Sequence, residues 1–270
     1  MDLDLGLRER CAALVERSGS TQPFGTYILP ATDPAAELGR IVEREVFGEF
    51  FSNTPEMLSD EYEPYEAGSM FLCVVDHRRL VPAGVMRVVV PSPCGLKSLN
   101  DISRVWEQPT AEVIARAVDP FDQRSCWDIA TFAITEEYRG AATEGLVSLA
   151  LYQALVMCSE ARGIGWYVAV MDTKVLDAIS ARIADPFVPF PGLAPKSYMD
   201  SPASVPVYVD IPAFEGRLAD REPPIHEILF SGTGLEAAVA TPDWAVAAEA
   251  ALQPVPAQAG SDTTVRSGRS

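Results

Sequence analysis

The stretch that most constrains the fold is residues 127–183, where strand and helix patterns alternate. Two short apolar runs of strand length are separated by a segment of helix length and composition. Two strands joined by a helix predict a βαβ unit with parallel strands, and a glycine-bearing loop before a helix is a place where an anion can bind. The predicted succession is strand Trp127–Ile134, loop Glu136–Gly145, helix Leu146–Arg162, strand Trp166–Met171 and a helix from Asp172 to about Ile183.

The residues before this unit predict helices and one hairpin. Apolar runs at Met70–Val75 and Ala83–Val90 flank a polar turn, which indicates two antiparallel strands. The acidic, proline-containing segment Pro55–Gly68 predicts a loop. Other predicted elements are helices at Leu3–Ser18, from Asp33 through an apolar stripe to Phe51, at Leu96–Trp106 and at Thr110–Val118, with a strand at Tyr27–Leu29.

After residue 183 the chain becomes rich in proline and then in alanine. Val205–Ile211 and Ile225–Phe230 predict strands, residues 235–240 and 243–252 have helical patterns, and residues 254–270 are typical of a disordered tail. Antiparallel strands followed by a βαβ unit predict an α+β fold. We expect a mixed, mostly antiparallel central sheet with helices on both faces. We also expect one domain over residues 1–253, with an N-terminal helix and a C-terminal helical extension.

Charge and cysteine usage narrow the classes of function. The net charge of −17 argues against nucleic-acid binding and against an anionic membrane surface, because both need a basic footprint. No apolar run reaches the length of a membrane span, and the N-terminus lacks the pattern of a signal peptide. The five cysteines form no CxxC pair, which favours reduced thiols in a cytoplasmic protein and predicts no metal site.

Three segments together resemble one enzyme family. Residues 61–66 (EYEPYE) are similar to an acidic E-x-D-x-(F/Y)-D segment, and Arg87 lies in a strand that ends in proline. Residues 127–134 (WDIATFAI) are similar to an E-x-S-R-F-A-V strand, with Asp128 at the glutamate and Thr131 at the arginine. In this order they resemble acyltransferases of the N-acetyltransferase (GNAT) superfold, in the branch of acyl-homoserine-lactone synthases and long-chain N-acyl amino acid synthases. The resemblance covers roughly residues 42–211.

The resemblance implies an acyl thioester as donor, carried on coenzyme A or on an acyl carrier protein, and a sheet that splits where this donor enters. The strand backbone at Phe132, Ala133 and Ile134 would bind the pantetheine arm and the thioester oxygen. The following loop would contribute Arg139, Gly140 and Gly145 to donor binding. The loop matches the superfold pattern Q/R-x-x-G-x-G/A only at Arg139, and its Glu144 would repel a phosphate, which favours the branch with carrier-protein donors.

The resemblance also implies a small amine, or an amino-acid-like molecule, as acceptor. Acyl transfer to an amine needs a polarised carbonyl, a group that removes a proton from nitrogen, and alignment of the two reactants. Glu63, Glu66 and Asp128 are the candidate carboxylates that hold the acceptor ammonium and relay its proton. Arg87 is the candidate partner that keeps one carboxylate ionised and fixes its direction.

Other interpretations of these residues stay open. The acidic segment 61–66 can be a solvated surface, Arg87 a structural ion-pair partner, Asp128 a cap or a partner within the sheet, and Arg139-Gly140 simple turn chemistry. Two other functions also fit the sequence. One is an acetyl-CoA-dependent N-acetyltransferase with an altered loop, and the other is a non-catalytic protein that binds an acyl or amine ligand on the same fold.

Overall fold

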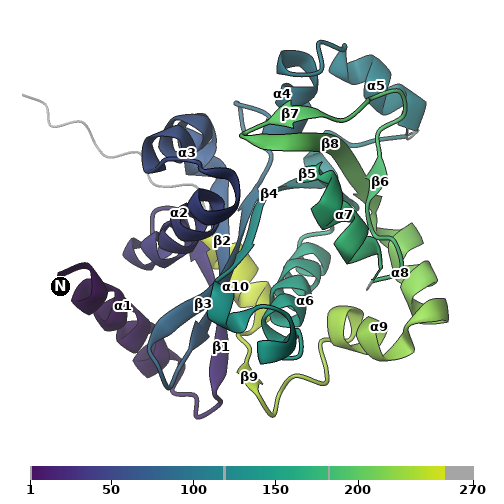
Figure 1. Cartoon of the computed structure of the whole chain (residues 1–270). Helices are drawn as coiled ribbons and strands as arrows, with labels where there is room; N and C mark the ends of the chain where they lie inside the picture. The colour runs from purple at the N-terminus through teal and green to yellow at the C-terminus, as the bar shows by residue number, and fades with distance from the viewer. Residues whose placement is uncertain (1, 118–119, 182, 253–270) are drawn as a thin grey trace, which may run out of the picture.

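The computed structural model of the chain describes residues 2–117, 120–181 and 183–252. Val118 at the end of a predicted helix and the predicted disordered tail at residues 254–270 lie outside the described residues. Figure 1 shows a twisted central sheet with helices on both of its faces. The predicted α+β class with a mixed sheet is therefore confirmed.

The elements follow the predicted order over most of the chain. The helices and strands are α1 (Asp2–Ser18), β1 (Phe24–Pro30), α2 (Glu37–Phe51), α3 (Pro55–Tyr62), β2 (Ser69–Asp76), β3 (Val81–Val89), α4 (Lys97–Arg104), α5 (Thr110–Ala117), β4 (Cys126–Ile134), α6 (Leu146–Ala161), β5 (Trp166–Asp172), α7 (Thr173–Ser180), β6 (Val188–Pro189), β7 (Lys196–Tyr198), β8 (Ser201–Asp210), α8 (Ile211–Arg221), α9 (Pro223–Phe230), β9 (Val239–Ala240) and α10 (Trp244–Ala251). Short 3-10 turns lie at Pro34–Ala36, Glu63–Gly68, Gln123–Ser125, Glu136–Tyr138 and Gly140–Ala142.

The described strands form a nine-stranded sheet in the order β6-β8-β5-β4-β3-β2-β1-β9, with β7 paired to β8. Two pairs, β4 with β5 and β1 with β9, are parallel, and the other pairs are antiparallel. The parallel pair β4 and β5 belongs to the predicted βαβ unit, with α6 as its connection (Figure 1). None of the described helices is long and apolar enough to cross a membrane.

The sheet splits between β4 and β5. These strands pair only where residues 126–128 lie opposite residues 166–168, although β4 continues to Ile134 and β5 to Asp172. A bulge at Ala130 bends β4 at the start of this separation, since Arg87 pairs with Thr131 while Val88 pairs with Ile129. The expected split in the sheet is therefore present.

Each face of the sheet has its own apolar core. One face carries Met86, Trp127 and the other strand residues that pack against α6, α8, α9 and α10. The opposite face carries two smaller clusters, one beneath α1 and α2 and one beneath α4 and α5. Helix α6 is apolar nearly all round because it lies between the sheet and helices α9 and α10.

The predicted loop at Pro55–Gly68 is wrong, because this segment forms α3 and a 3-10 turn. Thr54 caps the helix by accepting a hydrogen bond from Met57 N at 3.2 Å, and Pro55 occupies the first turn, where its missing N–H costs nothing. Acidic residues then occupy the solvent side of α3, while Leu58 and Tyr62 are buried. The segment is helical because its cap and its buried pair at i and i+4 outweigh its acidic composition.

Two predictions near the C-terminus are also wrong. Ile225–Phe230 belongs to helix α9, not to a strand, and His226 stacks on Phe230 one turn later. The helical pattern over residues 235–240 ends in strand β9, which pairs with β1 at the edge of the sheet. Pairing with β1 satisfies backbone groups that a short, isolated helix would leave open. The helix predicted over residues 243–252 is present as α10.

Candidate active site

A buried arginine on β3 organises the polar interior. Arg87 is 3% exposed and lies on the sheet face that α2 covers. Its Nε and Nη2 donate to the two carboxylate oxygens of Glu43 at 2.9 and 2.7 Å, and its Nη1 donates to Glu66 Oε2 at 2.6 Å. Its guanidinium also lies over the rings of Tyr62 and Phe71, at 4.4 and 4.5 Å from their centroids. The attraction of two carboxylates outweighs burial and raises the pKa of Arg87.

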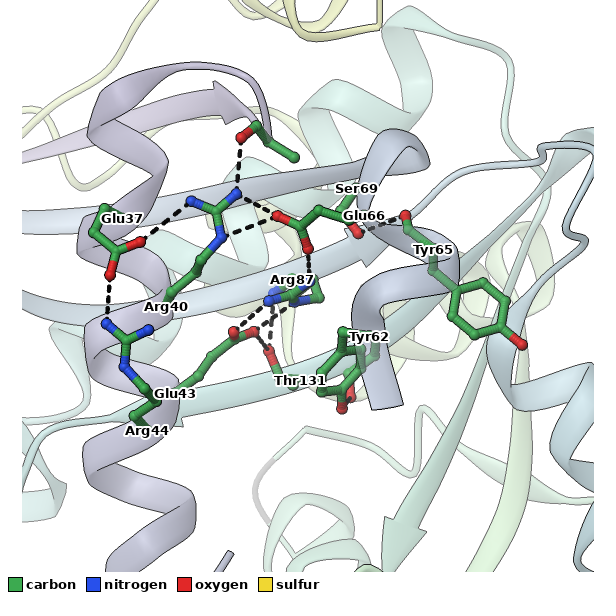
Figure 2. Close-up of polar contacts among 12 residues, drawn as sticks. Glu37, Arg40, Glu43, Arg44, Tyr62, Tyr65, Glu66, Ser69, Arg87 and Thr131 are labelled. Carbon is green, nitrogen blue, oxygen red and sulfur yellow. Dashed lines mark hydrogen bonds and ion pairs between the residues drawn. The ribbon is translucent and has the colours of Figure 1, made fainter. Parts of the chain in front are cut away.

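The charges continue as an alternating chain along α2, which Figure 2 shows. Arg40 binds Glu66 and also contacts Glu37, and Glu37 binds Arg44. Burial alone would raise the pKa of Glu66, but the guanidinium groups of Arg87 and Arg40 outweigh it and hold this pKa below its ordinary value. Glu66 is therefore ionised and stabilised by its partners, which makes it a weak proton acceptor.

A second buried cluster surrounds Lys97 on α4. Its ammonium contacts Asp101 at 2.8 Å, Glu61 at 2.7 Å and the hydroxyl of Tyr198. Burial opposes the charged form, but Tyr198 and the carboxylates of Asp101 and Glu61 raise the pKa of Lys97 well above its ordinary value. The ring of Tyr62 lies within cation–π distance of both Lys97 and Arg87. Tyr62 therefore joins the two charged clusters.

Asp128 lies apart from Arg87, behind the first turn of α4. It is fully buried, and it accepts hydrogen bonds from the backbone N–H and the hydroxyl of Ser98, at 2.5 and 2.7 Å. Burial raises the pKa of Asp128 from 3.8 to about 6, and the two bonds from Ser98 oppose this rise. The contacts of Asp128 hold α4 against β4.

A cleft of about 110 Å³ lies along the split between β4 and β5. Thr131 and Phe132 line it from β4, Met171 and Asp172 line it from β5, and Tyr62 lies at its rim. The hydroxyl of Thr131 donates to Glu43 Oε1 at 2.5 Å, so the cleft is linked to the Arg87 network. Tyr62 also lines a polar pocket of about 300 Å³, together with Arg40, Glu43, Arg44, Glu63, Glu66 and Arg87.

Two further cavities meet the cleft at Phe132 and Ile179. A large open cavity of about 780 Å³ is lined by Gly140, Glu144 and Gly145 from the loop before α6. An apolar pocket on the other side of Phe132 is lined by residues of α6, β5, α8 and α9. Phe132 and Ile179 line all three spaces, and the ring of Phe132 stacks on Tyr152.

The backbone of β4 is open at the split. Thr135 N donates to Ala83 O at 3.1 Å, and antiparallel ladders alternate. Ala133 therefore directs its backbone groups toward β3, while Phe132 and Ile134 direct theirs toward β5. Arg139 Nε donates to Ile134 O at 2.6 Å, which agrees with this orientation. Among the described strands, none pairs with this edge of β4 beyond Asp128.

Of the loop residues predicted to bind the donor, Gly140 and Gly145 line the large cavity, and both have positive φ angles, 57° and 80°. Arg139 is directed elsewhere, since its Nη1 and Nη2 donate to Glu49 at 3.1 and 2.9 Å. Its guanidinium also lies 4.5 Å from the centroid of the Phe50 ring. Arg139 therefore ties the loop to α2.

The structure brings Glu66 and Arg87 into contact and places Glu63, which is exposed, in the same polar pocket. Sequence reasoning missed Glu43 and Lys97. A signal for Glu43 was the need of a strand arginine for a buried partner, because Glu43 adjoins Val42 in the apolar stripe of α2. No group of three metal-ligating side chains gathers within the described part of the chain.

No family model matches the chain, and no curated protein matches it. Solved structures do. An N-acyl amino acid synthase from uncultured soil microbes, FeeM, aligns with a TM-score of 0.54 and 13% identity, over 74% of this chain and 97% of its own. The CoA-dependent acyl-homoserine lactone synthase BjaI, with SAM and isopentyl-CoA, aligns with a TM-score of 0.52 and 18% identity, over 84% and 99%. The chain therefore has the fold of GNAT-type acyltransferases, as in these two synthases.

Proposed function

We propose that this protein is an N-acyltransferase that moves an acyl group from a thioester to a small amine or amino-acid-like acceptor. The observation that carries the proposal is the split of the sheet, where three cavities of different character meet at Phe132. A thioester donor has three parts, and their chemical character matches that of the three cavities. These are a long polar arm, a carbonyl that must be polarised, and an apolar acyl chain.

The donor arm occupies the large cavity beside Gly140 and Gly145, and the acyl chain enters the apolar pocket. The carbonyl oxygen then lies at the open edge of β4, where the Phe132 N–H points into the split. A backbone donor fixed in this way stabilises the oxyanion that forms when an amine attacks. The donor is carried on coenzyme A or on a carrier protein, and the five free thiols fit a reducing compartment such as the cytoplasm.

The acceptor occupies the cleft and the polar pocket, on either side of Tyr62. Glu63, Glu66 and Arg87 surround its charged groups, and the pairs in this network hold the side chains in place. Asp128 acts through Ser98 by fixing α4, whose Lys97 contacts the Tyr62 ring. In this arrangement Glu66 and Arg87 bind the acceptor, and Asp128 positions the wall around it.

The test is a donor and acceptor panel with purified protein. Acetyl-CoA, a long-chain acyl-CoA and a long-chain acyl carrier protein are each mixed with amino acids and small amines, and N-acyl products are measured by mass spectrometry. We expect products from a long-chain donor. Turnover of acetyl-CoA alone would replace the proposal with an ordinary N-acetyltransferase. Absence of any product would contradict acyl transfer.

The site residues are tested by substitution, once a substrate pair is found. Glu66→Gln removes a charge from the acceptor pocket, and we expect kcat/KM to fall about 10- to 100-fold. Asp60→Asn, at an exposed position of the same α3 region, is the matched control and keeps full activity. If Glu66→Gln and Asp128→Asn both keep full activity, the assignment of the site is wrong.

A second candidate function is a non-catalytic ligand-binding protein. The observation in its favour is that both oxygens of Glu66 and of Glu43 are already held by guanidinium groups. A protein of this kind would be stabilised by acyl thioesters or amines in a thermal shift assay and would form no product.

A further inference from the structure

The cleft has a second polar wall, opposite Thr131, that the proposed function has not used. Ser201 and Ser204 of β8 line the cleft beside Asp172 at the end of β5. Asp172 lies directly opposite Ser204 in the antiparallel pairing of these strands. Ser201 is 4% exposed and Ser204 is 2% exposed, and most of the cleft between this wall and Phe132 is apolar.

The hydrogen bonds along this wall have a fixed direction. Ser201 Oγ donates to Asp172 Oδ2 at 2.7 Å, which uses the single proton of the Ser201 hydroxyl. Ser204 must therefore be the donor in its 2.8 Å bond to Ser201 Oγ. Within the described part of the chain, no group donates to Ser204 Oγ. The hydroxyl protons of both serines thus point toward Asp172, and the acceptor lone pairs of Ser204 remain open.

We propose that Ser204, Ser201 and Asp172 form the relay that removes the proton from the attacking amine. This inference rests on the proposed acyl transfer. As the nitrogen forms its bond to the acyl carbon, its proton passes to Ser204 Oγ. The proton of Ser204 passes to Ser201 Oγ, and that of Ser201 passes to Asp172. The products are the amide, the free thiolate of the donor, and a protonated Asp172, which can return the proton to that thiolate.

The opposite wall is less suited to accept a proton. Thr131 also leads to a carboxylate, Glu43, but both oxygens of Glu43 are bound by Arg87. No ion pair of Asp172 occurs among the described residues. Its two oxygens have separate partners, since Oδ1 accepts the backbone N–H groups of Lys174 and Val175 while Oδ2 faces Ser201.

The surroundings of Asp172 contain few other titratable groups. Lys174 on α7 and Glu144 before α6 share the large cavity with it. Tyr198 on β7 shares the cleft, but its hydroxyl donates to Asp101 at 2.6 Å and contacts Lys97. Lys196 on β7 lies opposite Ser204, but its ammonium donates to Val105 O at 2.8 Å.

Asp172 also caps α7, so its substitution must preserve the cap. Asn is as good a cap as Asp, because its side-chain oxygen can accept the same two backbone N–H groups. Asp172→Asn therefore keeps the cap and places an amide NH2, which can only donate, where Oδ2 accepted the proton of Ser201. Ser204→Ala removes the hydroxyl that touches the amine and adds no atom that could clash.

The experiment measures kcat/KM against pH for the wild-type protein and these variants, with the acceptor of highest turnover in the panel. We expect each variant to lose about 100-fold at neutral pH, the low end of general-base effects. The wild-type profile should depend on two protonations, that of the amine, which must be neutral to attack, and that of the relay carboxylate. The Asp172→Asn profile should depend on the amine alone and so fall less steeply toward acidic pH, and a purely structural role would not change this profile.

A double variant and a control separate the alternatives. Ser204→Ala combined with Asp172→Asn should be no slower than either single variant, because the relay acts as one unit. Thr131→Val should keep the wild-type pH profile. The relay is overturned if Asp172→Asn keeps the wild-type rate and profile, or if Thr131→Val alone changes the profile, while acyl transfer still stands. A wild-type protein that makes no N-acyl product overturns both proposals.

Discussion

At the scale of single residues, the surroundings of each carboxyl group decide what it can do. Glu66 and Asp128 come from two segments that resemble one family, yet their pKa values shift in opposite directions. Burial acts on both carboxyl groups. Two guanidinium partners reverse the effect of burial on Glu66, whereas the N–H and hydroxyl of Ser98 and the charge of Lys97 only reduce it for Asp128. Sequence spacing cannot reveal this difference, because it depends on partners from distant elements.

The raised pKa of Asp128 makes a prediction about stability and pH. In the unfolded chain this carboxyl titrates near 3.8, and in the folded protein near 6. The folded state therefore binds the proton more tightly, so the contribution to stability is full below pH 4 and is lost as pH rises through 6. Relative to Asp128→Asn, which stays neutral, the wild-type free energy of unfolding should fall by about 3 kcal/mol in all, of which about 2 kcal/mol is lost between about pH 4.5 and 7.

Urea denaturation of the two proteins at several pH values between about 4.5 and 7 checks this expectation. The comparison with Asp128→Asn cancels the titration of all other groups. Asparagine can keep both contacts with Ser98, because its oxygen accepts the N–H and its amide donates to the hydroxyl. A difference between the proteins that does not change with pH would show that Asp128 is ionised throughout.

Sequence reasoning at this scale found Arg87 but not its main partner. A charge inside an apolar strand needs compensation, so Arg87 stands out in the sequence of β3. Glu43 was hidden because it lies among the apolar residues of α2, where the hydrophobic pattern dominates. Lys97 was hidden for a different reason. Its partner Asp101 comes four residues later, but Glu61 and Tyr198 come from elements far apart in the sequence.

At the scale of elements, α2 lies unusually close to the sheet. A Cβ atom added at Gly39 would be 2.5 Å from Phe71 Cδ1 and 3.0 Å from Val85 Cγ2. The close approach lets the next residue, Arg40, reach Glu66, and it lets Glu43, one turn along the helix, reach Arg87. The position of the charged network therefore depends on a glycine that makes no polar side-chain contact.

Two alanine substitutions in α2 test this dependence. Gly39→Ala should lower the free energy of unfolding by about 1–3 kcal/mol, because the added methyl group overpacks the interface with Phe71. Gly48→Ala is the matched control. Its nearest neighbour would be Asn53 O at 3.6 Å, so better helix propensity should raise stability by about 0.5–1 kcal/mol. Thermal or urea denaturation measures the stability of both variants. If Gly39→Ala and Gly48→Ala change the stability by the same amount in the same direction, the close approach at Gly39 is contradicted.

Elements with a strong period or a clear boundary were predictable. The hairpin, the βαβ unit and α6 are close to their predicted bounds because long apolar patterns define them. α3, α9 and β9 were not, since the conformation of each depends on what it packs against or pairs with. The split between β4 and β5 was expected only through the family resemblance, because no local pattern marks where two strands separate.

At the scale of the whole molecule, the net charge of −17 repels anionic ligands. The large cavity does not reverse this field, since its lining includes Lys174 but also Glu144 and Asp172. Arg139, the nearby loop cation, is paired with Glu49. A donor with several phosphates therefore approaches against the electrostatic field.

This field makes a prediction about ionic strength. With an acyl-CoA donor, KM should fall about 2- to 10-fold when ionic strength rises from about 0.01 M to about 0.15 M, because salt screens the repulsion. The same acyl group on N-acetylcysteamine carries no phosphate, so its KM should not change. Steady-state kinetics with both donors decide the matter. A KM for acyl-CoA that rises with salt would mean that local cations dominate the net charge.

The extra residue at Ala130 has a consequence for comparing this chain with other proteins. In a regular strand, residues three apart point in opposite directions, yet Asp128 contacts Ser98 and Thr131 contacts Glu43 from the same side of the sheet. The alternation of side chains between the two faces of the sheet therefore shifts by one residue at Ala130. Without that one residue, the side chains on one side of the bulge would change faces. Thr131 would then point into the apolar core under α6, and Phe132 would point toward the charged residues beneath α2. A residue-by-residue comparison across this point therefore holds only with a protein whose matching strand carries the same extra residue.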